Sequence, residues 1–295
     1  MKFRPPTENE RRKAIGELNG LPEDSRQAFL PNDDFEAIRD PSPNDWLAVH
    51  TERGQTFAEF VRSQPNKPDA IRNTIYIQPL DNFETESEPR LQKLSQFAEA
   101  FFTIPIRILP PSNVSQRQIT TRTNPQTHQP QLLTGDILGI LRHNLPADAF
   151  CTIGVTMRDL YPSPSWNFVF GEASLDGRVG VFSFARYDPA FYGTAIENRE
   201  LLVLRRSCKV LAHETSHMFG IQHCIFFNCL MNGSNHLDES DRRPLHVCPV
   251  DLRKLHFSIG FDINRRYRDL LRFAHTAGFN DEVQWLERRL RIQAA

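Results

Sequence analysis

The chain has 295 residues, of which 39% are hydrophobic and 24% charged, and its formal net charge at pH 7 is -1. This composition is that of an ordinary globular protein with one large domain or two modest ones. The near-neutral charge gives no reason to expect a nucleic acid or an anionic membrane as partner, and no run of about 18 apolar residues predicts a transmembrane helix.

The first part of the chain, residues 1–70, is polar and rich in proline, and we expect it to be an extension packed on the core. Thr7 and Glu10 have the spacing of a capping box before a charged helix near residues 8–18, and residues 55–62 have a short amphipathic pattern. The segment lacks the apolar core of a signal peptide, which predicts an intracellular protein of the cytoplasm or nucleus. In that reducing environment, clustered cysteines indicate metal ligands before disulfides.

The second part, residues 71–220, alternates between strand and helix patterns. Strands are expected at 74–80, 104–109, 150–157, 166–173 and 178–185, and helices at 88–102, 135–143 and 198–219. Thr134 is a candidate cap, the Asp-Gly pair at 176–177 indicates a hairpin, and the polar segment 110–133 predicts a long flexible loop. The order predicts an α/β (α+β) fold with a mixed sheet and one antiparallel edge strand.

The third part, residues 221–295, begins with little periodicity and many cysteine, histidine, asparagine and aspartate residues. Helical patterns return at 252–259, 265–277 and 281–292. We therefore expect three parts with boundaries near residues 70 and 220.

A histidine motif stands at the end of the long predicted helix, where His213, Glu214 and His217 are followed by Gly220 and His223. Histidines four apart face the same side of a helix, so both can bind one zinc ion at about 2.0–2.1 Å. In an unbroken helix His223 would lie about 15 Å along the axis from His213. The helix must therefore end, and Gly220 can adopt the left-handed conformation that ends helices.

This motif predicts hydrolysis. Three neutral imidazoles leave one zinc position for a water molecule, whose pKa the ion lowers toward about 7. Glu214 can take a proton from that water and pass it to a leaving amine. The alternative is a polar helix face with hydrogen-bonded histidines. The fixed offsets of Gly220 and His223 make a chance match far rarer than the first two histidines alone do.

The whole string resembles the metzincin clan, whose pattern is His-Glu-x-x-His-x-x-Gly-x-x-His followed by a methionine turn. Met231, eight residues after His223, corresponds to that methionine and is expected to support the site without binding metal. More narrowly, the chain resembles the archaemetzincins, which have cysteines interleaved with the motif. Here these are Cys224, Cys229 and Cys248. Segments 159–161, 167–173 and 232–237 are also similar to that family.

The resemblance implies an intracellular zinc metalloprotease that acts on peptides or proteins, with a metzincin-like fold. It implies an upper catalytic subdomain at 71–220 and a smaller, zinc-stabilised lower one at 221–295. It also implies a second, structural zinc ion bound by four cysteines. We expect a monomer with two zinc ions and no nucleic-acid or membrane partner.

The fourth cysteine position departs from the family pattern, because the expected Cys-x-x-Cys reads Cys248-Pro249-Val250-Asp251. Aspartate can bind zinc at about 2.0–2.2 Å. Three thiolates and a carboxylate would need nearby cations, for which the candidates are Arg242, Arg243, Arg253 and Lys254. The alternatives are His246 or His256 as fourth ligand, or a degenerate site with three reduced thiols and no metal.

Other assignments stay open on the sequence alone. A catalytically weak, zinc-stabilised protein-binding module is the alternative to the enzyme, and a zinc-ribbon nucleic-acid module is disfavoured by the charge. The group that would stabilise an oxyanion is unassigned among His236, Tyr161 and Tyr192. Cys208, on the metal-bearing helix, is expected to be a buried small residue rather than a nucleophile.

Overall fold

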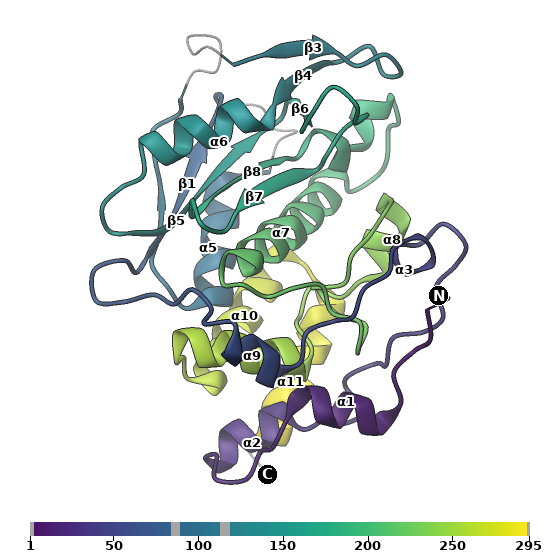
Figure 1. Cartoon of the computed structure of the whole chain (residues 1–295), viewed down its shortest axis with the longest axis vertical. Helices are drawn as coiled ribbons and strands as arrows, with labels where there is room; N and C mark the ends of the chain where they lie inside the picture. Colours follow the sequence, from purple (N-terminus) through teal and green to yellow (C-terminus); the bar gives the residue numbers. More distant parts are fainter. Residues whose placement is uncertain (1–2, 84–88, 113–118, 294–295) are drawn as a thin grey trace. The chain divides into compact units, whose positions relative to one another are not determined.

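A five-stranded sheet forms the centre of the first of two units in the computed structural model, which describes residues 3–83, 89–112 and 119–293 (Figure 1). This sheet unit comprises Lys67–Glu99 and Ile104–Met218. Its strand order is β2-β1-β5-β8-β7. The strands are β1 (Thr74–Pro79), β2 (Ile106–Ile108), β5 (Ala149–Thr156), β7 (Gly171–Ser174) and β8 (Val179–Ser183). β7 is antiparallel to β8 and the other pairs are parallel, which confirms the expected mixed sheet.

Helices cover both faces of this sheet. They are α5 (Leu91–Phe102), α6 (Thr134–His143) and α7 (Arg199–Met218). Val179 and Val181 of β8 belong to an apolar cluster with residues of α6. Because strand side chains alternate between faces, Gly180 points to the other side, where Met218 of α7 lies. α6 and α7 therefore pack on opposite faces, and every residue of the central strand β5 is buried.

Two strands of a small second sheet, β3 (Thr121–Thr123) and β4 (Pro130–Leu133), lie within the segment 110–133 that we expected to be a flexible loop. The third strand is β6 (Asp159–Tyr161), and the strand order is β3-β4-β6. The loop prediction is therefore wrong for the described part, because β3 is short and mostly exposed and shows no apolar alternation. Residues 113–118 of that prediction lie outside the described residues.

The start of α6 also differs from the prediction. Leu133, the last residue of β4, occupies the cap position, and Thr134 is the first helical residue. The Thr134 hydroxyl donates to the Glu172 carboxylate and lies 3.4 Å from the carbonyl oxygen of Tyr161. Thr134 therefore links the helix to its neighbouring strands rather than capping it.

The predicted hairpin is present but shorter than expected. β7 begins at Gly171 rather than at residue 166, although the amide of Ser183 still donates to the carbonyl of Phe170 at 2.9 Å. The turn ends at Arg178, whose φ is 53°. Two short 3₁₀ helices, Ala185–Tyr187 and Pro189–Tyr192, lie in the segment between β8 and α7.

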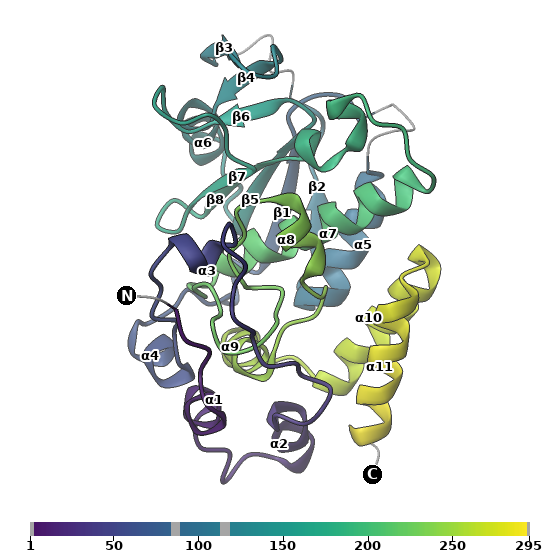
Figure 2. The same cartoon turned by 90° about the vertical axis from the view of Figure 1, so that its right-hand side faces the viewer.

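The second, helical unit comprises Met1–Asn66, Ala100–Thr103 and Phe219–Ala295. Its helices are α1 (Glu8–Ile15), α2 (Glu23–Phe29), α3 (Trp46–Val49), α4 (Phe57–Arg62), α8 (Leu237–Arg242), α9 (Pro249–Ile259), α10 (Ile263–Ala277) and α11 (Asn280–Gln293). Figure 2 shows α9 among α1, α2 and α4, while α10 runs beside α11. The capping box of Thr7 and Glu10 is confirmed.

The amino-terminal helices are fixed to α9 by hydrogen bonds as well as by packing. Arg253 of α9 donates to the carbonyl oxygen of Ile15, the last residue of α1, and to that of Glu17, two residues further along the chain. Among the described residues, no helix is both long and apolar enough to cross a membrane.

Candidate functional site

The two histidines at the end of α7 face each other. Their Nε2 atoms are 3.1 Å apart, and the rings of His213 and His217 meet edge to face. A tetrahedral zinc ion with Zn–N distances of 2.0–2.1 Å holds two nitrogens about 3.3 Å apart. The four-residue spacing thus brings two nitrogen donors to the separation that one zinc ion requires.

The helix ends where the spacing predicted. α7 stops at Met218, and Gly220 has a φ of +83°, in the left-handed region. The side chain of Gln55 holds this turn, because its Nε2 donates to the carbonyl of Gly220 and its Oε1 accepts from the amide of Gln222, both at 3.2 Å. Gln55 was not predicted to contribute to the site.

The turn brings the third histidine to the other two. One ring nitrogen from each of His213, His217 and His223 lies within 4.8 Å of the others, so the group could hold a metal ion. Three imidazoles are a donor set that zinc prefers. Glu214 is half-buried on α7 and three residues before His217, a spacing that places two side chains on the same side of a helix.

His223 also has a carboxylate partner. Its Nδ1 lies 2.7 Å from Oε1 of Glu52, and the indole nitrogen of Trp46 donates to the same oxygen at 2.8 Å. Burial favours a raised pKa for Glu52, but the hydrogen bond and charge of His223 and the bond from Trp46 lower its pKa overall. No sequence pattern singled out Glu52 or Trp46, which lie in the polar extension.

The cysteine cluster forms a second group of donors. Cys224, Cys229, Cys248 and Asp251 are all buried, and each has a ligand atom within 4.8 Å of the others. The sulfur atoms of Cys224 and Cys248 are 3.6 Å apart. Oδ2 of Asp251 is 3.3 Å from the sulfur of Cys229 and 3.5 Å from that of Cys248. Tetrahedral zinc requires separations of about 3.8 Å between two sulfurs and about 3.5 Å between sulfur and oxygen, so the four donors fit an ion.

Lys254 is the cation beside this group. Its Nζ lies 2.9 Å from Oδ1 of Asp251, and both side chains are buried. Burial raises the pKa of Asp251 to about 6, although the ammonium of Lys254 acts to lower it. The other three candidate cations bind elsewhere: Arg242 to Asp45, Arg243 to the carbonyl of Asn232, and Arg253 to the end of α1.

The two histidines considered as a fourth ligand are engaged in other contacts. Nδ1 of His246 lies 3.0 Å from Glu282, and its ring stacks on Trp285 with centroids 3.7 Å apart. The ring of His256 packs against the edges of two phenylalanine rings. Among the described residues, Asp251 is therefore the donor that completes the cysteine group.

Met231 and the remaining candidates are placed as follows. Met231 is fully buried, and its carbonyl accepts from the amide of Cys224 at 2.8 Å. His236 lies 3.1 Å from Asp45 through Nε2, and its Nδ1 accepts from the amide of Glu239. Tyr161 is buried, whereas Tyr192 is exposed. Cys208 is fully buried, as expected, and burial raises its pKa well above the ordinary value.

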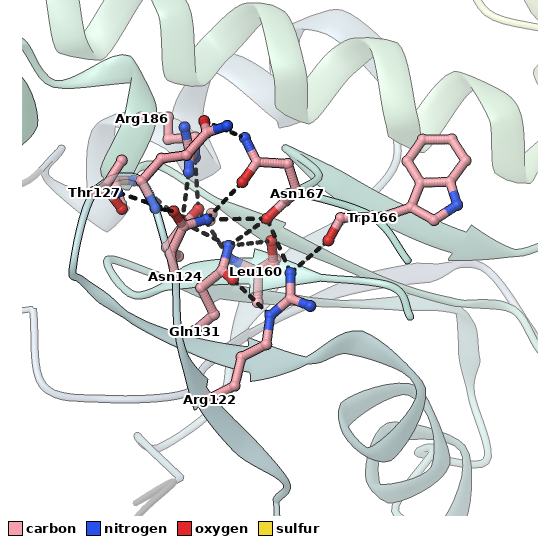
Figure 3. Close-up of polar contacts among 12 residues, drawn as sticks. Arg122, Asn124, Thr127, Gln131, Leu160, Trp166, Asn167 and Arg186 are labelled. Carbon is pink, nitrogen blue, oxygen red and sulfur yellow. Dashed lines mark hydrogen bonds and ion pairs between the residues drawn. The ribbon is translucent and has the colours of Figure 1, made fainter. Parts of the chain in front are cut away.

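The residues that lead into the edge strand β7 are fixed by a polar network (Figure 3). Arg122 donates to the carbonyl oxygens of Pro164, Trp166 and Asn167, and its Nε donates to Gln131 at 2.8 Å. Gln131 also donates to the carbonyl of Asn167 at 2.9 Å. The backbone before β7 is thereby held in place, and the indole of Trp166 is 60% exposed.

A buried ion pair is joined to this network, because Gln131 also donates to Oδ2 of Asp159 at 2.9 Å (Figure 3). Asp159 of β6 and Arg186 make two contacts of 2.8 Å, and their side chains are 1% and 6% exposed. The guanidinium of Arg186 lies 3.6 Å from the centre of the Phe168 ring. The loop before β7 is thus fixed from its backbone and from one of its side chains.

Comparisons with known proteins show which family the chain is similar to. The family model described as peptidase family M54 matches residues 108–256. Archaemetzincin-2 of Rattus norvegicus is 43% identical over 276 residues, 84% of this chain and 77% of the rat protein. Archaemetzincin-1 of Mus musculus is 35% identical over 274 residues, 83% of this chain and 55% of the mouse protein. A crystal structure of archaemetzincin from Archaeoglobus fulgidus is 30% identical in sequence and matches with a TM-score of 0.46. The match covers 61% of this chain and 99% of the Archaeoglobus chain. The chain therefore belongs to the archaemetzincins, peptidase family M54, a family of metzincin zinc metallopeptidases.

Proposed function

We propose that the chain hydrolyses peptide bonds at a zinc ion held by His213, His217 and His223. The observation that carries this proposal is the grouping of three imidazole nitrogens within 4.8 Å. The separation of 3.1 Å between two of them supports it, because it is close to the spacing of about 3.3 Å that two nitrogens have on one tetrahedral zinc ion. Zinc bound there would supply Lewis-acid activation of water and of the substrate carbonyl.

Glu214 is the group that would move the proton. It follows the first histidine and stands on the same side of α7 as His217, so it can reach a water at the metal position without being a ligand. In this role it accepts the proton of the attacking water and donates it to the leaving amine. Gly220, through its left-handed conformation, keeps the third histidine available to the same ion.

The substrate would bind along β7. This strand is at one edge of the five-stranded sheet and its residues are half-buried, so its backbone can pair with an extended peptide. The fixed loop before it supports this proposal, because a strand edge that is already ordered loses less conformational entropy on binding. We therefore propose that the peptide lies antiparallel to residues 171–174, extending toward Trp166.

A second, structural zinc ion would be held by Cys224, Cys229, Cys248 and Asp251. It would connect the segment after His223 to the start of α9, for which Cys248 is the cap residue. Metal binding by such a group acts as local folding energy. Met231, whose backbone bonds to Cys224, would be fixed by the same ion and supports the turn that follows the motif.

A peptide-library digest with the wild-type protein and a Glu214→Gln variant tests the proposal. Cleavage by the wild type that disappears in the variant, with both proteins folded and zinc-loaded, is the expected result. A wild type that binds zinc but cleaves no peptide would overturn the enzymatic role and favour a zinc-stabilised protein-binding module.

A further inference from the structure

We propose that Glu52 is a positioning residue for the catalytic zinc site, acting through His223. The inference rests on the proposed function, because it concerns a ligand of the proposed ion. It assigns a role in the active site to a residue of the polar amino-terminal extension, far from the histidine motif in sequence.

The contact between Glu52 and His223 defines which ring nitrogen of His223 can bind a metal. A carboxylate can only accept hydrogen bonds, so Nδ1 of His223, at 2.7 Å from Glu52, carries the proton. The other ring nitrogen is then unprotonated and can donate its lone pair to zinc. A carboxylate behind a metal-binding histidine fixes the ring tautomer and orientation and raises the basicity of the ligand.

Glu52 is itself held in place by Trp46. The indole N–H donates to the same carboxylate oxygen at 2.8 Å, and the rings of Trp46 and His223 meet edge to face with centroids 5.2 Å apart. The indole of Trp46 also stacks on the ring of His50, with centroids 3.8 Å apart. Trp46 therefore packs against His223 and at the same time orients the carboxylate that His223 contacts.

Trp46 is fixed in turn by the segment that follows Met231. Its backbone amide donates to the carboxylate of Glu239 at 2.8 and 3.0 Å. A Cβ placed on Gly233 would lie 2.5 Å from the indole ring, so the backbone passes directly against the ring at this point. Because an indole cannot bend away, only glycine leaves room for this contact.

The group formed by Asp45, His236 and Glu239 has a structural role in the same arrangement. These residues have ligand atoms close enough to hold a cation. However, Asp45 accepts from Arg242, and Glu239 accepts from the amides of Trp46 and Asn235. The donors are therefore used to fix the start of α3, which carries Trp46, and they support the position of Glu52.

The test compares zinc affinity in Glu52→Ala, Glu52→Gln and the wild type, measured by competition with a chromophoric chelator. A His217→Ala protein shows how much zinc the cysteine group alone binds. Subtracting that amount gives the zinc bound at the histidine site, which is the first site below. The expected loss at the first site is about 10- to 100-fold for Glu52→Ala. Glu52→Gln should lose less, because its amide oxygen can still accept from Nδ1. Cobalt substituted at this site should show a changed visible absorption in Glu52→Ala.

Glu59→Gln is the matched control. Glu59 lies in the same extension and caps α4 through Thr56, so its loss should leave zinc affinity unchanged. Glu52→Ala with wild-type zinc affinity and an unchanged cobalt spectrum would overturn the positioning role and leave a partly exposed ion pair. A wild type that binds no more zinc than His217→Ala would instead overturn the proposed function itself.

Discussion

The ammonium of Lys254 lies 2.9 Å from Oδ1 of Asp251, and neither side chain reaches solvent. The second oxygen of the same carboxylate faces the sulfurs of Cys229 and Cys248. Asp251 therefore joins a buried cation to the cysteine group, which a cysteine at this position would not do. Lys254 would offset part of the negative charge that three thiolates and a carboxylate would bring to the proposed second zinc ion.

This contact predicts the zinc content of Asp251 variants. The wild type should hold two zinc ions, and Asp251→Ala should hold one, because three ligands and an unpaired buried lysine bind the second ion poorly. Asp251→Cys should retain two ions. Mass spectrometry after dialysis against a mild chelator measures this. A wild-type value of one, unchanged in Asp251→Ala and rising to two in Asp251→Cys, would show a degenerate site.

Lys254 should also matter for stability. In Lys254→Met the Asp251 carboxylate loses its buried partner, and breaking such a pair costs about 3–5 kcal/mol. Urea unfolding of zinc-depleted protein measures the change, with Lys13→Met, an exposed lysine of α1, as control. A loss for Lys254→Met no larger than that for the control would contradict the role of the ion pair.

Replacing Gly220 with alanine should destabilise the protein because of the backbone conformation at this position. An added Cβ would meet Pro65 only at ordinary contact distance, 3.5 Å, but the φ of +83° is unfavourable for alanine. We expect Gly220→Ala to lower the free energy of unfolding by about 1–2 kcal/mol.

Gly139, within α6, is the matched control for that substitution. A Cβ there meets nothing within 4 Å. Gly139→Ala should stabilise by about 0.5–1 kcal/mol. Chemical denaturation measures the free energy of unfolding of both variants. A Gly220→Ala protein as stable as Gly139→Ala would show that the left-handed turn is not needed.

The parts of the fold that were predictable are those with a local signal. The buried strand β5, the long helix α7 and the hairpin followed from apolar runs and from an Asp-Gly turn, and the helix break followed from Gly220. The strands β3 and β6 were not predicted, because each has only three residues and β3 faces solvent. Short strands of this kind are defined by their neighbours rather than by their own pattern.

The candidate site also contains residues that the sequence predicts and residues that it does not. His213, His217 and His223 lie within one stretch of chain, so helix geometry and the break at Gly220 together predict how they meet. Glu52 is 171 positions from His223, and Gln55 is 165 from Gly220. Contacts over such separations depend on how the extension packs, and one carboxylate or amide in a polar segment carries no signal of that packing. The sequence alone therefore predicts the candidate ligands but not the residues that hold them in place.

Arg122 should affect substrate binding more than turnover. Arg122→Ala removes three bonds to the backbone before β7, so the strand edge must be ordered when a peptide binds. We expect a raised KM for peptide cleavage with a smaller change in kcat. Arg158→Ala, which breaks a half-exposed pair with Asp81, is the control. Equal KM values for Arg122→Ala and the control would argue against substrate binding along β7.

The most direct test of the central claim is zinc content measured beside peptide turnover in the wild type, Glu214→Gln and His217→Ala. Glu214→Gln should keep the zinc of the wild type and lose most hydrolysis, because a base that is not a ligand has been removed. His217→Ala should lose one zinc ion and hydrolysis together, because two imidazoles hold the ion poorly. Equal zinc loss in both variants, or full turnover in Glu214→Gln, would contradict the proposed division between ligands and base.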